Sequence, residues 1–150
     1  MSLVGQFEHT VLMERHLFAL IEDAPGNDDP FTVLPAPLGF LAREGNVVVE
    51  SELADQEARV RVEIWDSTPE TPRGTFIAMG EAHQVRFESE RIQLINIMRE
   101  PAGEAHELAS PGPYSVCLFR SPQEENPSEP LEAFRNFERF VIQIWNLTRP

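Results

Sequence analysis

The stretch Arg59-Val-Arg-Val-Glu-Ile-Trp65 is the clearest local pattern in the sequence. Its odd-numbered positions are charged or aromatic, and its even-numbered positions are valine or isoleucine. Successive side chains of a β-strand point to opposite faces, so this strict alternation predicts a strand with one buried and one solvent-facing surface. The stretch therefore indicates a β protein in which sheets pack on one side.

Working outward from this stretch, further β-rich segments follow one another along the chain. They are residues 46–51, 75–88, 91–98, 114–120 and 138–147. Gly80 predicts a bulge within the second segment, and Ser89-Glu90 is expected to be the tip of a hairpin. The segment 91–98 alternates poorly, which predicts burial on both faces. Turns containing proline and glycine join these segments without intervening helices. We expect an all-β fold, an antiparallel β-sandwich or open barrel of six to eight strands with little helix.

Residues 7–22 fit neither period cleanly. Leu12, His16 and Ala19 would share one face of a helix. A strand interrupted near Glu14-Arg15 fits the apolar positions as well, and we favour it. The helical alternative stays open.

Composition limits the class of protein. A chain of 150 residues with 41% hydrophobic residues is expected to form a single domain, residues 1–150, with a core that needs no disulfide or metal. The net charge is −13, and all 12 basic residues are arginine. Such a charge repels nucleic acids and anionic membrane surfaces, so neither is an expected partner. With no apolar run of membrane-spanning length and no targeting segment, we expect a cytoplasmic protein.

Residues for catalysis or metal binding are not arranged in a recognisable way. Cys117 is the single cysteine and is expected to be a small core residue. The histidines at positions 9, 16, 83 and 106 lack metal-ligand spacing, and we expect them to be isolated at the surface. There is no nucleophile elbow and no phosphate-binding glycine loop. We therefore predict no catalytic residue, no metal and no cofactor, and a protein that is not an enzyme.

Two features are candidates for binding a partner. Trp65 ends the alternating strand on its polar face, a position suited to an interface anchor as well as to packing beneath a loop. The polar segment 121–130 and the residues after it carry several carboxylates suited to an arginine- or lysine-rich partner. The candidate binding residues are Trp65, Glu124, Glu125, Glu129 and Glu132.

The C-terminal half resembles a known group of proteins. It runs from Arg91-Ile-Gln-Leu through Pro111-Gly-Pro-Tyr-Ser-Val-Cys-Leu-Phe-Arg120 and an acidic loop to Glu138-Arg-Phe-Val-Ile-Gln-Ile-Trp145. This order is similar to that of small uncharacterised bacterial β-sandwich proteins. More remotely, it resembles the inhibitor of the nuclease that acts during DNA uptake in bacterial competence systems. The resemblance covers residues 45–147 and implies a sandwich and a small acidic protein that masks a basic enzyme.

Three hypotheses about function follow. The first is a non-enzymatic acidic binding module, an inhibitor or immunity-type protein, whose partner is a basic protein such as a nuclease. The alternative is a small-molecule-binding protein or an unrecognised enzyme with a pocket between the sheets, lined by residues such as Phe87, Tyr114 and Trp145. The third is a homo-oligomer that associates through an apolar sheet face.

Overall fold

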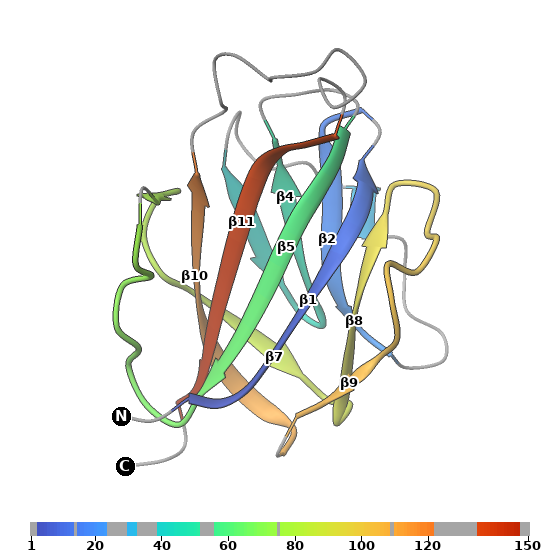
Figure 1. Ribbon diagram of the computed structural model, residues 1–150. Helices are drawn as coiled ribbons and strands as arrows, with labels where there is room; N and C mark the ends of the chain where they lie inside the picture. Colours follow the sequence, from blue (N-terminus) through green and yellow to red (C-terminus); the bar gives the residue numbers. More distant parts are fainter. Residues whose placement is uncertain are drawn as a thin grey trace.

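The structure is a computed structural model that describes residues 3–13, 15–23, 30–32, 39–51, 56–74, 76–108, 110–121 and 135–147. Its strands form two sheets packed face to face, with the six-stranded sheet in front in Figure 1. In spatial order, the six-stranded sheet contains β1 (Leu3–Met13), β5 (Gln56–Trp65), β11 (Arg135–Asn146), β10 (Gly112–Ser121) and β6 (Ile77–Ala78), and β7 (His83–Phe87) also pairs with β10. The five-stranded sheet contains β3 (Phe40–Arg43), β4 (Asn46–Glu50), β2 (Leu17–Glu22), β8 (Arg91–Asn96) and β9 (His106–Glu107). One 3₁₀ turn, η1, spans Pro30–Thr32.

The expected all-β sandwich is confirmed, and the two sheets do not close into a barrel. The described residues form eleven strands, more than the expected six to eight. The additional strands β3, β6 and β9 are two to four residues long, too short to show a period in the sequence. No helix in the described part of the chain is long and apolar enough to span a membrane.

The core lies between the sheets and follows the alternation of β5 and β11. Val60 and Val62 of β5, and Ile142 and Ile144 of β11, are fully buried in one cluster. Phe140 packs edge-to-face on Phe18 of the opposite sheet, with ring centroids 5.2 Å apart. These two strands run parallel to each other, whereas the other pairs among the described strands are antiparallel.

The ambiguous segment 7–22 is two strands, as favoured from the sequence. β1 lies in the six-stranded sheet and β2 in the five-stranded sheet. Between them, Arg15 and His16 have positive φ angles of 55° and 69°. Positive φ is uncommon for residues with a side chain and is typical of tight turns. The break predicted near Glu14-Arg15 is therefore where the chain crosses between the sheets.

The segment 75–88, predicted as one strand with a bulge at Gly80, is two strands that are interrupted around Gly80. β6 and β7 both pair with β10, where Ala78 lies opposite Phe119 and His83 opposite Val116. Residues 79–82 therefore face only residues 117 and 118 of β10. Gly80 has a φ of 92°, a conformation that glycine adopts without steric cost.

The hairpin predicted at Ser89-Glu90 is wrong. β7 belongs to the six-stranded sheet and β8 to the five-stranded sheet, so the chain crosses between layers at this point. β8 lies between β2 and β9 and is buried on both faces, as its poor alternation predicted. Its outward-facing Ile95 joins a second apolar cluster with Leu17, Ala19 and Val48. β8 is apolar enough to pair in either sheet. The packing of Ile95 in this second cluster favours the five-stranded sheet.

Candidate functional site

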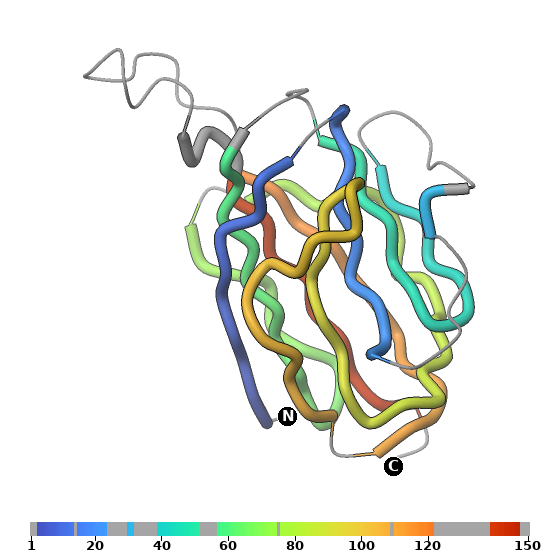
Figure 2. The backbone as a smooth tube through the Cα atoms, turned by 90° about the vertical axis from the view of Figure 1, so that its right-hand side faces the viewer, coloured from blue at the N-terminus to red at the C-terminus, as the bar shows by residue number. Residues whose placement is uncertain are grey.

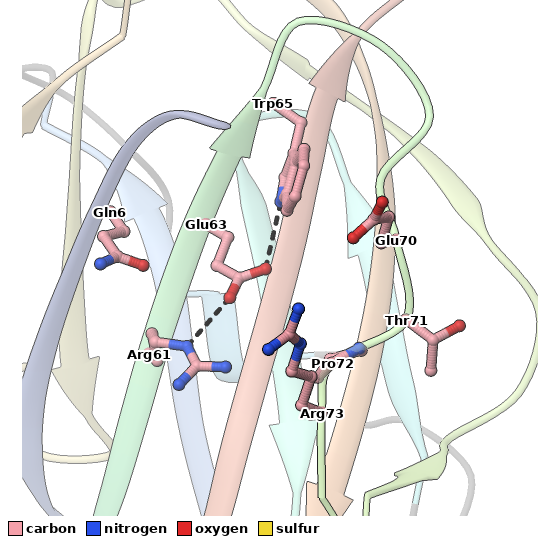
Figure 3. Close-up of a pocket in the computed structure, with 8 residues that line it drawn as sticks. All are labelled: Gln6, Arg61, Glu63, Trp65, Glu70, Thr71, Pro72 and Arg73. Carbon is pink, nitrogen blue, oxygen red and sulfur yellow. Dashed lines mark hydrogen bonds and ion pairs between the residues drawn. The ribbon is translucent and has the colours of Figure 1, made fainter. Parts of the chain in front are cut away.

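A groove lies on the outer face of the six-stranded sheet, the face turned away from the other sheet. Its volume is about 340 Å³, and β1, β5 and the segment 66–74 enclose it (Figure 3). The lining residues are Gln6, Arg61, Glu63, Trp65, Glu70, Thr71, Pro72 and Arg73. A groove of this size is at the small end of ligand-binding pockets in proteins.

The alternation of β5 builds the floor of this groove. Val60, Val62 and Ile64 are buried in the core, so Arg61, Glu63 and Trp65 point outward. After Trp65 the chain turns back along the same face, and residues 70–73 form the opposite wall. The pattern that specifies the core therefore also places three functional side chains in the groove.

Glu63 is the centre of a hydrogen-bond network, although it lies on an outer face. It is 7% exposed. Its Oε1 accepts hydrogen bonds from Trp65 Nε1 at 3.1 Å and Gln143 Nε2 at 3.0 Å, and its Oε2 accepts one from Arg61 Nε at 3.0 Å. A buried carboxylate is costly unless it is paired and hydrogen-bonded, and these three donors meet that need.

Gln143 fastens the segment 66–74 to the sheet. Its side chain is 2% exposed, and its Nε2 also donates to the backbone oxygen of Glu70 at 2.7 Å. Two residues far apart in the sequence, Glu63 and Gln143, are thus joined beneath the segment. Because the network fixes the positions of Arg61 and Trp65, it presents their side chains to a ligand in one orientation.

The described residues of the groove offer charged, amide and aromatic groups, some of which are already engaged with one another. Glu63 already accepts three hydrogen bonds, and Arg61 is held by it. Arg73 has no hydrogen-bond or ion-pair partner in the described part of the chain. Within the same residues, no group of three histidine, cysteine or carboxylate side chains could hold a metal ion.

Of the binding residues predicted from the sequence, the structure places Trp65 in the groove. Trp65 is half-buried, and its indole N–H is fixed by Glu63. The other four, Glu124, Glu125, Glu129 and Glu132, lie outside the described residues.

The strand ends that flank the four glutamates are far from Trp65. Arg135 pairs with Glu57 at the start of β5, whereas Trp145 pairs with Trp65 at its end. Glu57 and Trp65 are eight residues apart on one strand, a separation of about 26 Å. The two parts of the predicted site therefore start from opposite ends of the same sheet.

The pocket proposed between the sheets is not formed by the residues expected to line it. Phe87 and Tyr114 are buried in the core and pack edge-to-face, with ring centroids 5.9 Å apart. Trp145 alternates with the core residues Ile144 and Phe140, so it lies on the outer face. Both rings belong to the six-stranded sheet and fill the core where the pocket was expected.

Two histidines expected to be isolated form a pair. His9 of β1 and His106 of β9 are in contact through their Nε2 atoms at 2.9 Å, and Phe7 stacks on His106 with centroids 3.8 Å apart. Burial and, secondarily, His9 lower the pKa of His106, while Glu104 acts in the opposite direction. His16 is elsewhere, where its Nδ1 contacts the backbone oxygen of Ser51 at 3.0 Å. No spacing in the sequence reveals a pair formed by edge strands of two different sheets (Figure 2).

The expectation that Cys117 is a core residue is wrong. Val116 and Leu118 occupy the core, so Cys117 lies half-buried on the outer face, opposite Gln143. Burial raises the pKa of its thiol, which keeps the thiol protonated and weakly nucleophilic at neutral pH.

The fold and the groove define an acidic, open β-sandwich with a polar site on one outer face. No family model matches the chain, and no curated protein matches it in sequence. The solved structure of ComJ, inhibitor of the DNA degrading activity of NucA, from Bacillus subtilis, has a similar fold, with a TM-score of 0.60 and 16% identity over 97% of this chain and 98% of that one. The crocagin biosynthetic gene J product is also similar, with a TM-score of 0.56 and 11% identity over 96% of this chain and 99% of that one.

The resemblance noted in the sequence is confirmed for the fold, and it is more extensive than expected. It was expected to begin at residue 45. The structural match covers nearly the whole chain, and so takes in β1, β2 and β3.

Proposed function

We propose that this protein is a non-enzymatic inhibitor that binds a basic protein, and that the partner is a nuclease. The observation that carries the proposal is the similarity of fold to ComJ, a nuclease inhibitor, over nearly the full length of both chains. At 16% identity the likeness concerns the fold, so the function needs support from this chain's own chemistry.

The charge of the chain supplies that support. There are 25 carboxylates against 12 arginines, for a net charge of −13. Proteins that cleave DNA bind its phosphate backbone through basic surfaces. An acidic inhibitor is attracted to the same surface, and complementary charge accelerates association and lends specificity.

The proposed contacts are the glutamate segment and Trp65. Glu124, Glu125, Glu129 and Glu132 would steer the basic partner through long-range attraction. Trp65 would act as an anchor, since half-buried tryptophans supply a large share of binding energy at interfaces. The segment should therefore govern the association rate, and Trp65 the dissociation rate.

The first experiment tests the partner and the inhibition together. The immobilised protein is incubated with its native lysate at low salt, and bound proteins are eluted at high salt and identified. Each captured basic protein is then assayed for DNA degradation with and without an excess of this protein. We expect one captured nuclease whose activity is abolished. If no captured protein degrades DNA, or if degradation continues at saturation, the proposal is wrong.

Charge-reversed variants test the placement of the contacts. Glu124→Lys, Glu125→Lys, Glu129→Lys and Glu132→Lys are combined in one protein. The control combines Glu44→Lys, Glu81→Lys, Glu90→Lys and Glu100→Lys at exposed positions, with the same change in net charge. We expect the first variant to lower the association rate about tenfold more than the control. Equal effects would mean that only net charge matters and would contradict the assignment.

A substitution of Trp65 tests the anchor separately. We expect Trp65→Ala to accelerate dissociation about tenfold or more, with a small change in association rate. Trp65→Phe retains the ring and loses only the N–H, so its effect should be smaller. An unchanged dissociation rate in Trp65→Ala would place the anchor elsewhere.

A further inference from the structure

The outer face of the six-stranded sheet carries a group of arginines, although the molecule as a whole is strongly acidic. Arg59 and Arg61 point outward from β5, Arg139 points outward from β11, and Arg73 lies in the groove wall. We call these four residues the arginine strip.

Two members of the strip face each other across neighbouring strands. Arg59 and Arg139 are direct partners in the β5–β11 pairing. Two positive charges held side by side on one face of a sheet repel each other. The ion pair between Arg59 and Glu8, at 3.4 Å, is exposed on both sides and so contributes little. Arg139 has no partner in the described part of the chain. Among the described residues, the repulsion between Arg59 and Arg139 is therefore not offset at Arg139, and a bound anion would reduce it.

The other two members lie together in the groove. Arg61 Nε donates a hydrogen bond to Glu63 Oε2 at 3.0 Å, and this bond fixes the plane of the Arg61 guanidinium. Arg73, which is unpaired within the described residues, points toward the same end of the groove (Figure 3). A fixed guanidinium beside an unpaired one suits a planar carboxylate, which accepts two parallel hydrogen bonds from an arginine.

The surroundings favour an acidic peptide over a nucleic acid. Glu8, Glu63 and Glu70 lie among the arginines, so the strip lacks the continuous positive charge that binds a phosphate backbone. Side chains on one face of an extended peptide recur about every 6.8 Å, the same interval that separates Arg59 from Arg61. Pro72 offers an apolar wall for an intervening side chain.

We infer that the arginine strip is a docking surface for an extended, glutamate- or aspartate-rich segment of a protein partner. The inference goes beyond the proposed inhibition, because it concerns a surface and a partner of opposite charge. It holds or fails whether or not the protein inhibits a nuclease.

A labelled hexaglutamate peptide tests this surface in fluorescence anisotropy titrations. The salt concentration is about 150 mM, where the Debye length of about 8 Å limits the effect of distant charges. We expect saturable binding of hexaglutamate by the full chain, and none of a hexaglutamine peptide or of a short oligothymidylate.

Paired variants then test the position of the binding surface. Arg73→Glu with Arg139→Glu should weaken binding about tenfold or more. Arg43→Glu with Arg86→Glu changes the net charge equally, at exposed arginines of β3 and β7, and should leave affinity within about twofold. The inference would be overturned if hexaglutamate did not bind or if the two variants lost affinity for it equally. It would also be overturned if oligothymidylate bound with similar affinity.

Discussion

At the scale of single residues, the hydroxyl of Tyr114 closes the turn that leads into β10. It donates to the backbone oxygen of Ser110 at 2.6 Å, from a ring that is 2% exposed. Tyrosines in β-sandwiches make the same kind of bond to a residue a few positions upstream. We expect Tyr114→Phe to lower the free energy of unfolding by about 1–2 kcal/mol, because it leaves the acceptor without a partner.

Urea denaturation measures this loss as a lower midpoint with an unchanged m-value. Ser110→Ala is the control, since it retains the carbonyl and removes only the hydroxyl that Asn146 contacts at 3.2 Å. An unchanged midpoint in Tyr114→Phe would show that water replaces the bond without cost.

The pair His9–His106 makes stability depend on pH at the open edge of the sandwich. The pKa of His106 is lower in the folded protein than its ordinary value of 6.5, mainly because of burial and then because of His9. Below pH 6.5 the unfolded chain therefore binds more protons than the folded one. The stability from this group is present above pH 6.5 and is lost as the pH falls through the folded pKa.

We expect the urea midpoint of the wild-type protein to fall more steeply between neutral and mildly acidic pH than that of His106→Gln. His83→Gln, at an exposed histidine, should retain the steep fall. Identical slopes in His106→Gln and the wild type would mean that carboxylates alone cause the pH dependence.

At the scale of elements, Glu22 stabilises the connection from β7 to β8, which crosses between the sheets where a hairpin was predicted. Its Oε1 accepts from the backbone N–H groups of Glu88 and Ser89, at 3.2 and 3.1 Å. The carboxylate also lies close to Gly45, where an added Cβ would be 2.4 Å from Oε2. We expect Glu22→Ala to lower the free energy of unfolding by about 2 kcal/mol, because two backbone donors lose their acceptor.

Glu22→Gln retains an acceptor oxygen and should cost less than Glu22→Ala. Gly45→Ala should also destabilise, because its φ of 76° and the nearby carboxylate both oppose a side chain. Equal stability of Glu22→Ala and the wild type, measured by urea denaturation, would show that water replaces the carboxylate as acceptor for the two backbone N–H groups.

The elements could be predicted from the sequence to differing degrees, for a physical reason. β5 and β11 alternate because one face of each is buried and the other is exposed, so their faces could be assigned from composition alone. β8 is buried on both faces, and its sequence holds no information about which sheet it joins. The groove was only partly predictable: the position of Trp65 follows from alternation, but Gln143 reaches Glu63 through the pairing of β11 with β5.

At the scale of the whole molecule, both sheets share one core, so we expect them to unfold together. Trp65 and Trp145 are the only tryptophans, and both lie on the outer face of the six-stranded sheet. Tryptophan fluorescence therefore reports this sheet, while far-ultraviolet circular dichroism reports both. We expect the two urea transitions to coincide, as in a two-state domain.

Separate midpoints would contradict this expectation and show that the five-stranded sheet melts independently. Phe18→Leu provides a second check, since Phe18 belongs to one sheet and packs on Phe140 of the other. It should shift the fluorescence and dichroism transitions by the same amount.

By itself, the sequence determined the class of fold, the acidic character and the faces of the long strands, because burial on one side imposes a two-residue period and composition sums over the chain. It also indicated the break between β1 and β2 and an irregularity at Gly80, because residues with positive φ angles lie at both places. Only the tertiary structure decided which sheet each strand joins, that Gln143 and Glu63 share a network, and that His9 meets His106. Glu63 and Gln143 are 80 positions apart in the sequence, and His9 and His106 are 97 positions apart. The period of a single strand holds no information about contacts between such distant residues.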